Sequence, residues 1–175
     1  MNLFTDKKTL NVAESVRRVM GVKQLHESTN MELVIQMKKI LADGYAFYFK
    51  AHTFHWNVEG TNFPQYHDFL SKIYEQVFAS LDPIAEEIRA LGAYAPTSLT
   101  QLLQMSSISE TAGVPSPVDM LSTLSSDNEK IIQGLTAGYR MAESANELGL
   151  SNFLQDHIDK HKKLAWMITS TIKGA

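Results

Sequence analysis

The residues of this sequence that could perform chemistry gather between positions 52 and 86, where three of the six histidines stand. His55 and His67 are twelve residues apart, and Asp82 and Glu86 are four residues apart, so the two carboxylates would share one face of a helix. The chain has no cysteine, which excludes disulfides, thiolate zinc sites and cysteine catalysis. Any metal must therefore be bound through nitrogen and oxygen, and two histidines with two carboxylates suit a divalent ion such as Fe(II).

The same four residues also have an interpretation without a metal. A histidine on an apolar stripe is more often a hydrogen-bonded core residue than a ligand, and an Asp/Glu pair one turn apart is usually a solvated face. In addition, His67 and Asp82 lie fifteen residues apart on one expected helix, roughly 22 Å, whereas metal–ligand bonds are only about 2 Å long. Either the four side chains belong to unrelated sites, or the histidines of one chain meet the carboxylates of another across a two-fold interface.

The composition is that of an ordinary globular protein. Of the 175 residues, 44% are hydrophobic and 20% charged, and the net charge of −3 argues against a surface built wholly for nucleic acid. No apolar run approaches the roughly 18–20 residues of a membrane span, and the N-terminus has no signal-peptide core. We therefore expect a cytoplasmic protein without membrane contact, whose weakly basic first 25 residues are a candidate for contact with DNA.

Helices must hold the candidate residues, because apolar side chains recur at three- and four-residue steps and no stretch alternates like a strand. We expect residues 1–27 to form a partly helical N-terminal arm. The bundle domain then covers residues 28–175, and it opens with a helix that Ser28 or Thr29 caps and that runs to about Asn57.

Three more long helices are expected, over about residues 62–91, 117–148 and 151–172. Gly149 would end the third long helix and Ser151 would cap the fourth, while Pro83 predicts a kink within the second. The connection from 93 to 117 is long and would carry a short helix, Leu99–Met105. This order is typical of an all-α, ferritin-like four-helix bundle with one long crossover, although it leaves other bundles open.

The stretch HWNVEGTNFPQYH, followed by LDPIAEEIRALG, closely resembles the Dps-type mini-ferritins, the DNA-binding proteins from starved cells. The shared pattern is His-Trp-Asn, a Gly, an Asn-Phe pair, a second His, and an Asp-x-x-x-Glu further on. Every spacing matches at His55, Trp56, Gly60, Asn62, Phe63, His67, Asp82 and Glu86. The resemblance covers about residues 30–172 and includes the closing LAWMI of the last helix.

The resemblance implies a hollow homo-dodecamer of four-helix subunits with ferroxidase sites at its two-fold interfaces. Such a protein oxidises Fe(II) with hydrogen peroxide or dioxygen, stores the ferric mineral in its cage and protects DNA from oxidative damage. Carried over to this sequence, His55 and His67 bind iron from one subunit, and Asp82 and Glu86 bind it from the partner. Glu86 would be the strongest ligand and could bridge two irons, and zinc or manganese could substitute for iron.

Some residues depart from the family pattern. Many relatives carry a carboxylate where this chain has Ser71, so a second iron would be weakly held or bound through water. Pro83 stands between the two carboxylates and could alter their relative aim. The N-terminal arm is less rich in lysine than in DNA-binding relatives, which leaves DNA binding open.

The remaining candidates have supporting or structural interpretations. His52 could support a ligand without binding metal, and Trp56 would either lie close to the iron or serve packing. His157 and His161 are one turn apart but have charged neighbours, which favours surface histidines. A further acidic pair is a candidate for an iron-entry pore at a three-fold axis: Asp127 and Glu129.

Two other functions compete with a ferroxidase cage. A protein that compacts DNA with little ferroxidase activity would need a more basic arm than this one. An enzyme with a di-iron site inside each subunit would carry Glu-x-x-His motifs on two helices. None of the six histidines has a glutamate three residues before it, so the sequence excludes that enzyme.

Overall fold

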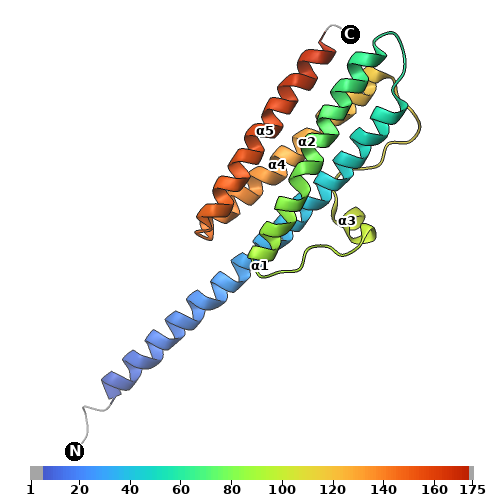
Figure 1. Ribbon diagram of the computed structural model, residues 1–175. Helices are drawn as coiled ribbons and strands as arrows, with labels where there is room; N and C mark the ends of the chain where they lie inside the picture. The colour runs from blue at the N-terminus through green and yellow to red at the C-terminus, as the bar shows by residue number, and fades with distance from the viewer. Residues whose placement is uncertain (1–5, 174–175) are drawn as a thin grey trace, which may run out of the picture.

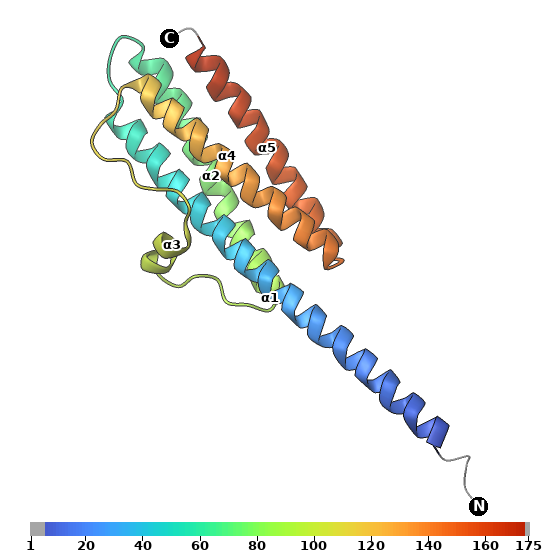
Figure 2. The ribbon, with the colours of Figure 1, turned by 180° about the vertical axis from the view of Figure 1, so that it is seen from behind.

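The computed structural model describes residues 6–173, and their side chains from Asn30 onward. This part of the chain holds five α-helices and no strand: α1 (Asp6–Asn57), α2 (Phe63–Ala90), α3 (Leu99–Met105), α4 (Pro117–Ser144) and α5 (Leu148–Ile172). The four long helices lie side by side, and α3 stands outside them on the crossover beside α1 (Figures 1 and 2). The expected all-α bundle of four long helices, with a short helix in its long crossover, is confirmed.

Apolar stripes on the four long helices face one another and form a single core. The largest side chains that are fully buried come from all four helices, for example Phe47, Leu70, Leu124 and Leu154. Helices α1 and α2 form one closely packed pair, α4 and α5 form the other, and α1 also packs on α4. This pairing follows the short connections within each pair and the long crossover between them.

Helix α1 is longer than expected. It is continuous from Asp6 to Asn57 and passes through Ser28 and Thr29, so the expected helix start at these two residues was wrong. No proline stands in this stretch to remove a backbone hydrogen bond, and a local capping signal cannot end a helix whose backbone ladder continues. The N-terminal part of α1 extends well beyond the bundle in Figure 1, while the domain boundary at residue 28 stays a prediction.

Helix α2, which carries most of the candidate ligands, has the expected ends. Asn62 occupies the N-cap position without a side-chain cap, and Pro64 stands in the first turn, where its missing N–H costs nothing. The helix continues through Pro83. At its other end Gly92 has a φ of 82°, a left-handed conformation that glycine adopts without strain.

The turn between α4 and α5 lies earlier than expected. Helix α4 ends at Ser144, and Asn146 takes the left-handed position with a φ of 60°. Gly149 and Ser151 both lie inside α5, so their expected roles as helix end and cap were wrong. Asparagine can replace glycine in this conformation because its short polar side chain tolerates it. The buried Ser151 instead donates its hydroxyl to the carbonyl oxygen of Glu147 at 3.0 Å.

Candidate metal half-sites

The end of α1 and the first turns of α2 bring His55 and His67 together. Their rings stack with centroids 3.7 Å apart and an interplanar angle of 24°. Nδ1 of His55 donates to the carbonyl oxygen of His67 at 2.9 Å, and Nδ1 of His67 donates to the carbonyl oxygen of His55 at 3.0 Å. The two residues therefore hold each other by a reciprocal pair of hydrogen bonds.

These hydrogen bonds determine which ring nitrogen is free. A carbonyl oxygen only accepts hydrogen bonds, so each Nδ1 must carry its proton. In the neutral ring the other nitrogen, Nε2, then keeps its lone pair. This is how metal-binding histidines are usually prepared, since a carbonyl that accepts from one nitrogen fixes the tautomer and the orientation of the ring. The pair is thus a candidate half-site with two free ring nitrogens.

The two carboxylates form a second, separate group. Asp82 and Glu86 are exposed on α2, and neither makes a hydrogen bond or an ion pair with a described residue. Carboxylates in this state are free to bind a cation or a partner.

The structure does not bring the histidine pair and the carboxylate pair together within one subunit. Among the side chains that the structure describes, from Asn30 to Lys173, no group of three or more His, Asp or Glu residues is arranged to hold a metal ion. The unbroken course of α2 explains this separation, because His67 lies at one end of the helix and Glu86 near the other. A site that contains all four residues needs a second copy of the chain.

Ser71 follows His67 by one turn, on the same face of α2. Its hydroxyl donates to the carbonyl oxygen of Asp68 at 2.8 Å. A serine bonded to its own helix in this way adds no negative charge to the half-site.

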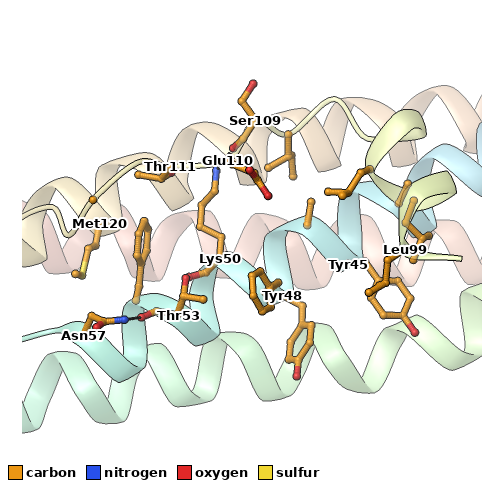
Figure 3. A pocket seen from close by; sticks show the side chains of 18 of the residues that line it. Tyr45, Tyr48, Lys50, Thr53, Asn57, Leu99, Ser109, Glu110, Thr111 and Met120 are labelled. Atoms are coloured by element: carbon orange, nitrogen blue, oxygen red, sulfur yellow. Dashed lines mark hydrogen bonds between the residues drawn. The ribbon is translucent and has the colours of Figure 1, made fainter.

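An apolar groove of about 580 Å³ lies between α1, α3 and the crossover (Figure 3). It follows α1 from Ala42 to Asn57 and is lined by large side chains that are strongly exposed, including Phe49, Leu99, Leu103 and Val114. This groove was not predicted from the sequence. The signal for it was the apolar content of α3, a helix that is too short to bury its residues in the bundle core.

A buried aspartate and a buried lysine of α1 fasten the crossover to the bundle. Asp43 accepts hydrogen bonds from the hydroxyls of Ser106 and Ser107, and Lys50 donates to the carbonyl oxygen of Ser109 at 2.8 Å. Lys50 also forms a buried ion pair with Asp127.

Asp127 does not have the pore role that the sequence suggested. Its carboxylate is 3% exposed and pairs with Lys50 and with Lys130, so it is neutralised inside the subunit. Glu129 is exposed, and the two carboxylates therefore do not form one acidic surface. Residues two apart on a helix point in different directions, which explains why Asp127 is buried while Glu129 is exposed.

His157 and His161 are buried, with 5% and 6% exposure, so the expected surface position was wrong. Both stand on the apolar stripe of α5, whose buried members are Leu150, Ser151, Leu154, His157, His161, Leu164 and Ile168. Nδ1 of His161 donates to the side-chain oxygen of Asn128 at 2.6 Å, and the amide of Asn128 donates back to the carbonyl oxygen of His161 at 2.9 Å. Burial, followed by the positive charges of His157 and Lys160, lowers the pKa of His161 to about 4.

Comparison with known proteins agrees with this architecture. Residues 35–174 match a family model described as a ferritin-like domain. The chain is 35% identical over 136 residues to an uncharacterized low temperature-induced protein of Nostoc sp., covering 77% of this chain and 76% of the relative. It is 28% identical over 139 residues to DNA protection during starvation protein 2 of Bacillus anthracis, covering 79% of this chain and 95% of the relative.

Among solved structures, the Dps protein of Vibrio cholerae aligns with a TM-score of 0.80 at 23% identity, over 83% of this chain and 91% of that one. The chain therefore belongs to the ferritin-like family. Within this family it is a Dps-type mini-ferritin, as the motif from His55 to Glu86 indicated. None of the helices described for this chain is long and apolar enough to cross a membrane.

Proposed function

We propose that this protein stores and detoxifies iron as a cytoplasmic ferroxidase that oxidises Fe(II) with hydrogen peroxide or dioxygen and keeps the ferric product inside a dodecameric cage. The observation that carries the proposal is the reciprocal hydrogen bonding of His55 and His67, which leaves both Nε2 atoms free to bind a metal ion. Membership in the ferritin-like family supports iron as the substrate.

The site is completed when two subunits meet about a two-fold axis. An isologous contact places the same helix of each subunit opposite its copy, so each end of α2 faces the other end of the partner's α2. His55 and His67 then meet Asp82 and Glu86 of the partner subunit, and each dimer has two identical sites. The nitrogen and oxygen ligands suit iron, zinc or manganese.

The apolar groove supports a second copy of the chain as the partner. Phe49 is 57% exposed, Leu99 73% and Leu103 59%, and all three line the groove. Large exposed apolar side chains that lie together are costly in a free monomer and are typical of an interface.

The chemistry follows from two Fe(II) ions at such a site. Two Fe(II) ions give one electron each to hydrogen peroxide, and with two protons the peroxide becomes two water molecules. Because both electrons go to the same peroxide, no hydroxyl radical is released. This outcome would protect DNA, as the name of the Bacillus anthracis relative indicates for that protein.

Anaerobic loading with Fe(II), followed by peroxide, tests the assignment in the wild type, His67→Ala and Glu86→Ala. Both variants should oxidise iron far more slowly, whereas Glu75→Ala, which removes another exposed carboxylate of α2, should match the wild type. Wild-type rates in both site variants would show that iron is oxidised elsewhere.

A mixing experiment tests the shared site. Cages reassembled from a His55→Ala/His67→Ala chain and an Asp82→Ala/Glu86→Ala chain should recover about a quarter of the wild-type sites, because half of randomly formed dimers are mixed and each has one intact site. If properly mixed cages recover no activity, the four residues do not act across an interface.

DNA compaction remains the alternative function, and the basic residues of the N-terminal arm are the feature that favours it. This alternative predicts retardation of DNA that weakens steeply as the salt concentration rises. Retardation by cages that fail to oxidise iron would favour it over the ferroxidase.

A further inference from the structure

A row of six rings runs along the contact between α1 and α2, next to the buried core. We call this row the ring seam: it consists of Tyr48, His52, His55, His67, Tyr74 and Phe78. On α1 its members are spaced by four and three residues, and on α2 by seven and four, so each set occupies one face of its helix. None of the six side chains is fully buried. The seam joins the histidine half-site to the middle of the α1–α2 pair.

Tyr74 lies at the centre of the ring seam. Its ring stacks on His52 with centroids 4.1 Å apart and an interplanar angle of 26°. It meets His55 edge-on at 5.2 Å and 68°, and it meets Tyr48 edge-on at 6.3 Å and 64°. Among the described residues of α2, only Tyr74 and His67 place a ring against His55.

The hydrogen bonds alone do not fix the orientation of the two imidazole rings in the half-site. Each imidazole of His55 and His67 is held by one bond to the other residue, so the pair could swing as a unit about these two bonds. Tyr74 limits this movement from outside the pair, because its ring is itself held between His52 and Tyr48. Edge-to-face and stacked ring contacts stabilise a ring's position beyond the effect of the area that they bury.

We propose that Tyr74 is a positioning residue of the histidine half-site, whose ring holds the imidazole of His55 so that the Nε2 atoms of His55 and His67 stay aimed at one divalent ion. This inference rests on the proposed function, since it assigns Tyr74 a role at the metal site named there. Small errors in ligand placement matter because a metal ion requires its ligands at fixed short distances.

The ring of Tyr74, and not its hydroxyl, carries this role. The hydroxyl makes no hydrogen bond with any described side chain or backbone group, whereas the ring meets three others. Tyr74→Phe should therefore keep the function, and a variant without a ring should lose it.

Binding of Co(II) to the assembled protein tests the proposal without any redox reaction. The visible absorption of bound Co(II) reports both the affinity and the geometry of its ligands. The variants are Tyr74→Phe, Tyr74→Leu and Tyr74→Met, with Phe78→Leu as the matched control. Phe78 belongs to the same face of α2 and contacts Tyr48, but it makes no ring contact with either ligand histidine.

We expect Tyr74→Phe and Phe78→Leu to bind Co(II) with wild-type affinity and spectrum. Tyr74→Leu and Tyr74→Met should bind about 10–100-fold more weakly, the usual effect of losing a group that orients a metal ligand. Their Co(II) spectrum should also change, which a general loss of stability would not cause.

Three results would overturn the proposal. The first is wild-type binding by both ringless variants. The second is Co(II) binding that is weakened equally in Phe78→Leu. The third is failure of both ringless variants to assemble. Any of these results would mean that Tyr74 has a role in packing alone. Failure of the proposed function would give a different result. The wild type would then bind no Co(II), or it would bind Co(II) that the His67→Ala substitution does not weaken.

Discussion

Protonation of His161 should destabilise the subunit as the pH falls below 7. This imidazole is buried between α1, α4 and α5, where it meets Phe47 edge-on and is hydrogen-bonded to Asn128. Burial lowers its pKa from 6.5 to about 4, and the positive charges of His157 and Lys160 act in the same direction. The unfolded chain therefore takes up a proton at a higher pH than the folded chain does.

The size of the effect follows from these two pKa values. Since the folded pKa is depressed, the stabilisation is fully present above about pH 6.5 and is lost as the pH falls to about 4. The full difference corresponds to about 3 kcal/mol, because one pKa unit equals about 1.4 kcal/mol. Between pH 7 and pH 5 the expected loss is about 2 kcal/mol per subunit.

Unfolding by guanidinium at pH 7 and pH 5, at one protein concentration, measures this loss in the wild type and in His161→Asn. Asparagine places an amide near the position of Nδ1, so it can still donate to Asn128 but cannot take up a proton. The burial-lowered pKa of His157 is present in both proteins, so the difference between them isolates His161. If both lose the same free energy of unfolding, His161 is not the titrating group and the argument fails.

Three further predictions concern the fold. Asp127→Ala leaves the buried ammonium of Lys50 without its partner and should lower the free energy of unfolding by about 3–5 kcal/mol in chemical denaturation; a loss below about 1 kcal/mol would mean that water solvates Lys50. Gly92→Ala should cost about 1–2 kcal/mol because its φ of 82° strains any side chain. Gly149→Ala should instead raise the melting temperature, since Gly149 lies inside α5 with no atom near the added Cβ. A lower melting temperature would show that Gly149 belongs to a turn and not to the helix.

The helices that local signals define were predicted well. The short helix Leu99–Met105 has the predicted bounds, and Ser98 caps it with a side chain that accepts from the backbone of Gln101. Pro117 starts α4 as expected, with Ser116 as its N-cap. These features depend on a few neighbouring residues, so the sequence contains all that is needed to find them.

Errors arose where a local signal was overridden by the rest of the fold. The third long helix was expected to end at Gly149, yet it ends before Asn146 because the packing of α4 against α5 sets where the chain must turn. Ser28 and Thr29 are good N-caps, but the helix ladder passes through both. Propensities of this kind differ by less than about 1 kcal/mol, which tertiary contacts easily exceed.

Residue types and spacing in the sequence already established that a metal would have nitrogen and oxygen ligands, and that His67 and Asp82 are too far apart to share an ion within one chain. Both conclusions follow from short-range facts: the absence of cysteine and the fixed rise of a helix. Tertiary folding established what depends on neighbours distant in sequence. It set the proton on Nδ1 of His55 and His67, and it turned His161 inward against Asn128. It also gave Asp127 its buried lysine partner, because a side chain's proton and charge state depend on which groups the fold places beside it.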